Sequence, residues 1–207
     1  MEIAILVFDD ITALDAVGPL DVLSRLPGAD IKIVAKQAGP LHAGAASAGL
    51  GLIADYALAQ VTAPQVLVVP GGMGTRSLVH DREITDWIRA VHQTTTWTTS
   101  VCTGALLLGA AGLLQGLRAT THWAAMDLLA GFGATTTSER VVEQGKIITA
   151  AGVSSGIDMA LTLAAKIAGA AEAQSIQLQI EYDPQPPFDS GSLAKASPEV
   201  RRLAGAE

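Results

Sequence analysis

The segment from Thr94 to Leu114 changes character at one point. A run rich in β-branched residues ends at Val101, and Cys102-Thr103-Gly104 then leads into a stretch of Ala, Leu and Gly. The first run favours a strand and the second a helix, so we expect a strand, a tight turn and a buried helix. That helix should end near Gln115-Gly116, because glycine is common just past a helix C-terminus. The turn contains Cys102, the only cysteine of the chain.

The same alternation of short apolar strands with helical patterns continues along the 207 residues. It predicts an α/β fold with a mainly parallel sheet and helices on both faces. We expect a single domain over residues 1–207, with a hairpin or short edge strands within residues 39–52. An extended Pro-rich tail should begin at about residue 183 and become weakly ordered toward Glu207. The expected strands span 2–8, 31–35, 65–69 and 94–101, with a late hairpin at 140–149, and the expected helices span 14–23, 81–92, 104–114, 124–130, 152–167 and 170–180.

Three loops that follow predicted strands carry chemically useful residues. Asp15, Gly71-Gly72 and Cys102 should meet at one edge of the sheet, where open α/β sheets bind ligands. A helix amino terminus stabilises a thiolate, which makes Cys102 a candidate nucleophile, and paired glycines can turn backbone N–H groups toward an anion. Each residue also has a structural interpretation: a small buried side chain for Cys102, a helix cap for Asp15 and a tight turn for the glycines.

The charge and composition of the chain argue against several classes of function. A net charge of −7 does not provide the clustered Lys and Arg that duplex nucleic acid or an anionic membrane surface requires. The amino terminus enters a strand pattern without a signal region, and no apolar stretch is long enough to cross a bilayer. One cysteine makes neither an internal disulfide nor a thiolate zinc cluster. We therefore expect a soluble, cytoplasmic protein that binds neither nucleic acid nor membrane.

Four motifs resemble those of the PfpI-type branch of the class I glutamine-amidotransferase-like superfamily, whose fold is flavodoxin-like with a nucleophile elbow at a strand-to-helix turn. They are Leu14-Asp15-Ala16-Val17-Gly18-Pro19, Val69-Pro70-Gly71-Gly72, Ser100-Val101-Cys102-Thr103-Gly104 and Ala119-Thr120-Thr121-His122-Trp123, and the similarity extends over nearly the whole chain. Peptidase-like members carry a histidine where this chain has Thr103, and many glyoxalase-type members carry a glutamate where it has Asp15. Regulators of transcription with these motifs continue into a helix-turn-helix domain, which we do not expect here.

The resemblance implies a cofactor-independent hydro-lyase that hydrates an isonitrile to an N-substituted formamide through a covalent thioimidate. Cys102 would be the attacking thiolate, and Asp15, protonated and hydrogen-bonded toward Cys102 and Thr103, would supply the proton. Backbone N–H groups of Gly72 and Thr103 would stabilise charge, with Gly71 and His122 as possible support, although a histidine at a helix start is commonly structural. The resemblance also implies a homodimer, and neither a metal nor an organic cofactor.

Two other functions remain open at this point. One is a glyoxalase or deglycase that acts on 2-oxoaldehydes with the same thiol, and the other is a non-enzymatic protein that senses redox state or binds a small molecule. A low pKa and an exposed sulfur would make Cys102 easily oxidised by peroxide. The natural substrate and the residues that line its pocket do not follow from the sequence.

Overall fold

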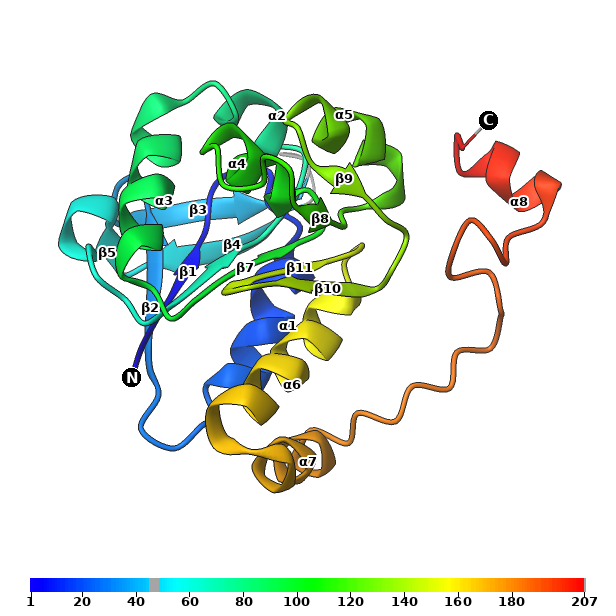
Figure 1. The fold of residues 1–207 in the computed structure, drawn as a ribbon. Helices are drawn as coiled ribbons and strands as arrows, with labels where there is room; N and C mark the ends of the chain where they lie inside the picture. The colour runs from blue at the N-terminus through cyan, green and yellow to red at the C-terminus, as the bar shows by residue number, and fades with distance from the viewer. Residues whose placement is uncertain (45–48, 207) are drawn as a thin grey trace.

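A seven-stranded sheet crosses the molecule in this computed structural model, which describes residues 1–44 and 49–206 (Figure 1). Its strand order is β10-β11-β7-β6-β1-β2-β5, and every neighbouring pair is parallel except β10 with β11. This arrangement confirms the predicted fold class and the late hairpin. The strands are β1 (Glu2–Leu6), β2 (Asp30–Ala35), β5 (Tyr56–Ala57), β6 (Val66–Val69), β7 (Trp97–Val101), β10 (Val141–Gln144) and β11 (Ile147–Ala150).

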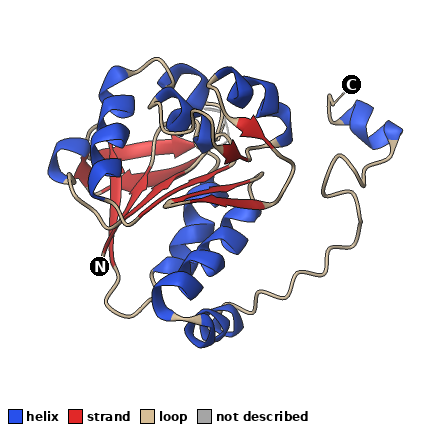
Figure 2. Cartoon of the chain, in the orientation of Figure 1, coloured by secondary structure: helices blue, strands red, loops and turns tan. Residues whose placement is uncertain are grey.

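Helices cover both faces of the sheet (Figure 2). On one face lie α1 (Ala13–Leu23) and α6 (Ser155–Ala168), which pack together, with α7 (Ala170–Gln179) against α6. On the other lie α2 (Thr75–Leu78), α3 (Arg82–Thr94), α4 (Gly104–Ala110) and α5 (Met126–Gly131). All four residues of β6 are buried, which explains why that strand is apolar without alternation. No helix of the described ranges is long and apolar enough to span a bilayer.

Short elements surround this body. The predicted hairpin forms from β3 (Gly39–Ala43) and β4 (Leu50–Ala54), an antiparallel pair separate from the main sheet. Residues 45–48, between these strands in the sequence, lie outside the described residues. A second small pair joins β8 (Arg118–Ala119) to β9 (Thr135–Thr136), and two 3₁₀ turns span Leu58–Gln60 and Trp123–Ala125.

Two boundaries around the central unit differ from the prediction. Thr94 belongs to the last turn of α3, where its hydroxyl donates to the Val91 carbonyl at 2.9 Å, so β7 begins only at Trp97. Helix α4 ends at Ala110 instead of Leu114. Gly112 has a φ of +78°, a left-handed conformation that glycine adopts readily and that ends the helix there.

The chain after α7 leaves the body as an arm, which we define as residues 183–206 (Figure 1). Its first part is exposed and contains Pro184, Pro186 and Pro187, which cannot continue a helix. Its end is a short helix, α8 (Pro198–Leu203), instead of the weakly ordered segment that we expected. Ser197 Oγ accepts a hydrogen bond from the Val200 N–H at 3.3 Å, and Pro198 opens the first turn, where its missing N–H costs nothing.

Candidate active site

Cys102 occupies a strained turn between β7 and α4. Its φ of 57° is rare for a residue with a side chain and is typical of a nucleophile elbow. The backbone of Cys102 is held on both sides, because its N–H donates to the Ala151 carbonyl at 2.8 Å and its carbonyl accepts from Thr121 Oγ1 at 2.8 Å. The residue is only 5% exposed. This turn is therefore fixed by the surrounding loops.

Two glycines allow the loops to approach the elbow. A Cβ atom on Gly71 would lie 2.5 Å from the Thr103 nitrogen and 2.6 Å from Thr103 Oγ1. A Cβ on Gly104 would lie 1.9 Å from the Val69 carbonyl oxygen. Real Cβ atoms do not come this close to other atoms, so the contact between the loop after β6 and the start of α4 requires glycine at both positions.

Asp15 lies in the first turn of α1 and is completely buried. Its Oδ2 accepts the Gly71 N–H at 3.0 Å, whereas its Oδ1 has no hydrogen bond of ordinary geometry among the described residues. Burial raises the pKa of Asp15 to about 6, while the Gly71 N–H and the Cys102 side chain lower it in part. The structure thus brings Asp15 and Cys102 together, with one carboxylate oxygen still able to accept a proton.

The protonation of this pair differs from the prediction. Burial, followed by the charge of Asp15, raises the pKa of Cys102 to about 11, although the N–H groups of Val153 and Thr103 oppose that shift. At neutral pH the free protein therefore holds a thiol beside an ionised carboxylate. The prediction of an exposed thiolate with a low pKa is wrong for this state, whereas the raised pKa of Asp15 agrees in direction with the expected effect of its buried surroundings. The pair still carries one proton, and that proton is on sulfur.

Thr103 is held by a network that the sequence did not reveal. Its Oγ1 accepts the Gly72 N–H at 2.9 Å and lies 3.1 Å from Thr75 Oγ1. Thr75 is completely buried, and its hydroxyl donates to the Gly72 carbonyl at 2.8 Å. The Gly72 N–H is therefore engaged by Thr103, in contrast to the charge-stabilising role we expected for it, while the Thr103 N–H approaches the sulfur.

Val153 is a second contributor that the sequence did not reveal. Its φ of 27° is an outlier for a β-branched residue, and its N–H approaches the Cys102 sulfur. Backbone strain of this kind persists where the surrounding structure enforces it, and it is common at functional sites. The only sequence signal was the run of small residues around Val153, from Ala150 to Gly156, which also fits an ordinary loop.

His122 lies at the start of the 3₁₀ turn Trp123–Ala125. Its Nδ1 accepts the Ala124 N–H at 3.2 Å, which leaves Nε2 to carry the proton of the neutral ring. Burial and the nearby charge of Arg76 lower the pKa of His122, so the ring is neutral at pH 7. The close packing of Gly152, where a Cβ would lie 2.9 Å from His122 Cδ2, fixes its position.

A cavity of about 500 Å³ adjoins the elbow. Three of its lining residues, Thr121, Ala151 and Val153, are also the residues that hold Cys102. His122, Trp123 and Met126 form much of the remaining wall, together with residues 191–194 of the arm. A substrate in this cavity would lie against the loops that hold Cys102, although Cys102 itself is not one of the lining residues.

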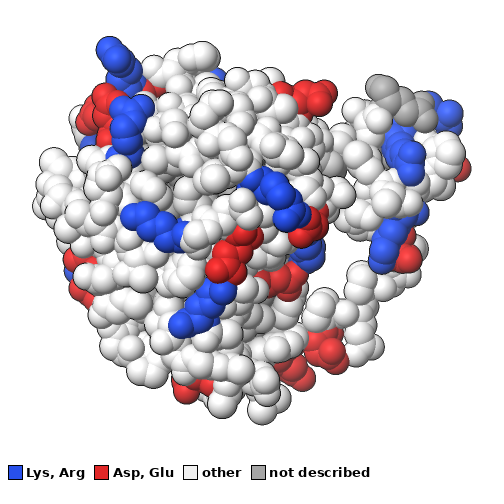
Figure 3. Space-filling view, viewed as in Figure 1, with Lys and Arg blue, Asp and Glu red and all other residues white. Residues whose placement is uncertain are grey.

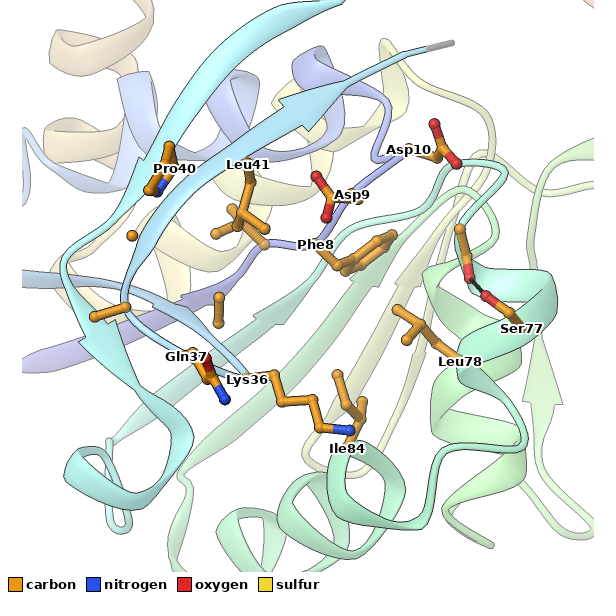
Figure 4. Close-up of a pocket in the computed structure, with 15 residues that line it drawn as sticks. Phe8, Asp9, Asp10, Lys36, Gln37, Pro40, Leu41, Ser77, Leu78 and Ile84 are labelled. Carbon is orange, nitrogen blue, oxygen red and sulfur yellow. Dashed lines mark hydrogen bonds between the residues drawn. The ribbon is translucent and has the colours of Figure 1, made fainter. Parts of the chain in front are cut away.

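A second cavity, of about 560 Å³, lies at the carboxyl ends of β1 and β2, next to the β3–β4 hairpin (Figure 4). Two of its charged side chains, Lys36 and Asp9, already have protein partners. Lys36 contacts Asp81 at 2.7 Å and Glu83 at 3.0 Å, and Asp9 Oδ1 accepts the His42 N–H at 2.9 Å. None of the residues that hold Cys102 lines this cavity, so we place the candidate active site in the first one.

Comparisons with known proteins agree with the motifs around Cys102. Residues 1–166 match the DJ-1/PfpI family. A relative named isonitrile hydratase, from Pseudomonas putida, is 46% identical over 192 residues, which cover 93% of this chain and 83% of that protein. A solved THiJ/PfpI family protein from Pseudomonas syringae is 40% identical with a TM-score of 0.93, covering 98% of this chain and 84% of that one. DJ-1beta from Drosophila melanogaster, 20% identical, shares the fold with a TM-score of 0.78 over 87% of this chain and 97% of its own.

Proposed function

This chain belongs to the DJ-1/PfpI family, as its motifs predicted, and within that family we propose that it hydrates isonitriles to N-substituted formamides. The nucleophile in this proposal is Cys102, and Asp15 transfers the proton. The relative from Pseudomonas putida, similar over most of both chains, supports this choice of reaction.

The single observation that carries the proposal is the buried pair of Asp15 and Cys102, which holds one proton. The terminal carbon of an isonitrile must receive both a nucleophile and a proton. A thiol next to an ionised carboxylate supplies both to the same atom, because the carboxylate can take the proton from sulfur and return it to carbon. Asp15 Oδ1, which has no hydrogen bond of ordinary geometry in the described chain, is the oxygen available for that transfer.

In the first step the Cys102 sulfur attacks the terminal carbon while Asp15 accepts the thiol proton. The anion that develops at this carbon then takes the proton from Asp15. The S–H bond is replaced by S–C and C–H bonds, N≡C becomes N=C, and the product is a thioimidate on Cys102. The N–H groups of Thr103 and Val153, which approach the sulfur, stabilise its negative charge during attack.

In the second step water adds to the thioimidate carbon. One proton of the water goes to nitrogen, and the other is accepted by Asp15 and returned to sulfur as the C–S bond breaks. The products are the N-substituted formamide and the free thiol of Cys102. His122, neutral and in the cavity wall, is the side chain that we assign to guiding this water.

The test is to incubate the purified protein with an alkyl isonitrile and to follow formamide by NMR. We expect formamide to accumulate linearly for many turnovers per protein, and only slow loss of methylglyoxal in a parallel assay. Faster turnover of methylglyoxal would favour the glyoxalase-type alternative. A protein that reacts with neither compound, but whose Cys102 is oxidised by peroxide, would favour a redox sensor.

We also infer that the protein is a cytoplasmic homodimer. Large apolar side chains on β4 support an interface between copies, since Leu50 is 58% exposed and Ile53 is 68% exposed. Light scattering coupled to size-exclusion chromatography would measure the mass, and Ile53→Asp should shift a dimer toward the monomer.

A further inference from the structure

We propose that the C-terminal arm forms the specificity wall of the active-site cavity, and that Leu193 contacts the apolar substituent of the isonitrile. This inference rests on the proposed function for the identity of the substrate. It assigns the arm a part in substrate selection, whereas the chemistry belongs to the elbow.

The position of residues 191–194 supports this role. They line the same cavity as Trp123 and Met126 and as the loops that hold Cys102. Leu193 is 37% exposed, compared with 78% for Phe188 and 80% for Leu203 on the same arm. Leu193 is therefore covered by its surroundings much more than Phe188 and Leu203 are. In Figure 1 and Figure 3 the extended part of the arm stands away from the body before the chain turns back toward it.

The base of the arm is attached to the cavity wall. Tyr182 donates a hydrogen bond from its hydroxyl to Asp158 Oδ1 at 2.8 Å, and Asp158 forms an ion pair with Arg140. Arg140 itself lines the cavity. The Gln177 side chain adds a bond to the Tyr182 carbonyl at 3.0 Å. The arm is thus attached, where it leaves the body, to the wall of the cavity that residues 191–194 also line.

The arm can hold a defined position because of its composition. Pro184, Pro186 and Pro187 stiffen the segment 183–190, which spans about 25 Å if it is fully extended at the rise of a polyproline helix. The segment that follows is closed by an ion pair between Lys195 and Asp189 at 2.6 Å and by the bond from the Ala196 N–H to the Ser192 carbonyl at 2.9 Å. A stiff spacer with a folded end piece places residues 191–194 at the cavity.

The chemistry of the wall indicates the class of substrate. Leu193, Trp123 and Met126 present apolar surface, and Arg140, which also lines the cavity, is paired with Asp158. Such a wall favours an uncharged alkyl or aryl substituent. We expect a methyl substituent to be too small to contact Leu193, and a benzyl or cyclohexyl group to reach it.

The first experiment compares methyl isonitrile with benzyl isonitrile in Leu193→Ala and Leu193→Asp. We expect KM for benzyl isonitrile to rise about 5-fold in Leu193→Ala, which loses part of an apolar contact. In Leu193→Asp it should rise about 30-fold, because a charge is placed against the apolar group. The kinetics with methyl isonitrile should stay within about 2-fold of the wild type. Leu203→Asp, on the exposed end of the same arm, is the matched control and should change neither substrate.

The second experiment does not depend on isonitrile chemistry. Cys102 is alkylated with iodoacetamide and with the larger N-benzylmaleimide, and the labelling rates are followed by mass spectrometry. Leu193→Ala should raise the benzylmaleimide-to-iodoacetamide rate ratio by about 3-fold or more, because it opens the wall to a bulky reagent, whereas Leu203→Ala should not.

The outcomes separate the two proposals. If the wild type hydrates no isonitrile but Leu193→Ala changes the labelling ratio, the proposed function fails and the assignment of the arm as a wall of the site stands. If Leu193→Ala leaves both the labelling ratio and KM for benzyl isonitrile unchanged, the arm is not part of the site and this inference is overturned.

Discussion

The elbow around Cys102 and the C-terminal arm differ in how they are built, although the loops that hold the elbow line the same cavity as the arm. Thr99 to Thr103 are at most 5% exposed, and the elbow is held by bonds from three other loops, which carry Gly72, Thr121 and Val153. Residues 183–195 of the arm are mostly exposed and contact the body at few points. Burial is what gives Asp15 and Cys102 their raised pKa values, so the chemistry needs the rigid region.

This difference separates reactivity from selection. A change in the elbow alters the protonation of Asp15 and Cys102 or the position of the sulfur, and it should affect every substrate. A change in the arm leaves the protonation of Asp15 and Cys102 unchanged, and it should affect only substrates that reach the arm. The following predictions test that division, beginning with the largest effect.

Cys102→Ser should abolish hydration of every isonitrile, with a loss of about 1000-fold or more in kcat. An alcohol is a far weaker nucleophile than a thiol, and no other side chain in the site replaces it. The measurement is formamide production with both methyl and benzyl isonitrile. Circular dichroism and the melting temperature should match the wild type, and turnover above a few per cent in a folded variant would contradict the role of Cys102.

Asp15→Asn should lower kcat by about 100-fold to 10,000-fold for both substrates, because an amide cannot carry the proton from sulfur to carbon. In the wild type, kcat/KM should rise with pH through about 6, as Asp15 ionises, and should fall only near 11, as Cys102 loses its proton. The pair titrates as a unit, so these values belong to the pair. A wild-type profile that first rises near pH 9 would instead indicate a free thiolate mechanism.

The same residue should make the folded protein less stable as the pH rises. The pKa of Asp15 is raised from 3.8 to about 6 in the folded state, so the folded protein binds more protons than the unfolded chain between these values. Stability is therefore lost as pH rises through this window, by about 3 kcal/mol in total. The free energy of unfolding of Asp15→Asn relative to the wild type should increase by about that amount between pH 4 and pH 7. Urea denaturation at a series of pH values would measure it, and a constant difference would contradict the raised pKa.

Substitution of Thr75, which supports the elbow, should have a smaller effect on kcat. Thr75→Val removes the hydroxyl that bonds to the Gly72 carbonyl and contacts Thr103, so kcat should fall about 10-fold for both substrates. Thr75→Ser retains the hydroxyl and should restore most of the activity. If the valine variant loses stability but keeps the wild-type kcat and pH profile, Thr75 supports the fold and does not position Thr103.

The sequence predicted what is encoded locally. The Gly71-Gly72 loop and Cys102 follow β6 and β7, and Asp15 lies in the first turn of the helix after β1, so the parallel order of the strands was enough to bring them to one edge. Two features that the prediction missed also had local signals: Gly112 for the end of α4 and Ser197-Pro198 for the start of α8. Stronger patterns in the surrounding sequence outweighed these signals.

What could not be predicted depends on contacts between distant residues. The protonation of Asp15 and Cys102 follows from burial, which no motif encodes. The engagement of the Gly72 N–H by Thr103 joins residues 31 positions apart. The contribution of the arm to the cavity depends on the path of a proline-rich segment across open surface, and an amino-acid pattern does not specify such a path.

The smallest expected effect tests the attachment of the arm. Tyr182→Phe removes the hydrogen bond to Asp158, which should cost about 1 kcal/mol of folding free energy or less. If this bond aligns the arm with the cavity, KM for benzyl isonitrile should rise about 2-fold to 3-fold, while methyl isonitrile is unaffected. Tyr56→Phe is the matched control, because its hydroxyl contacts Lys32 at 3.2 Å, at the opposite edge of the sheet. An equal change for both substrates would show that Tyr182 acts on the elbow through α6, and the division between a reactive region and a selective arm would then fail.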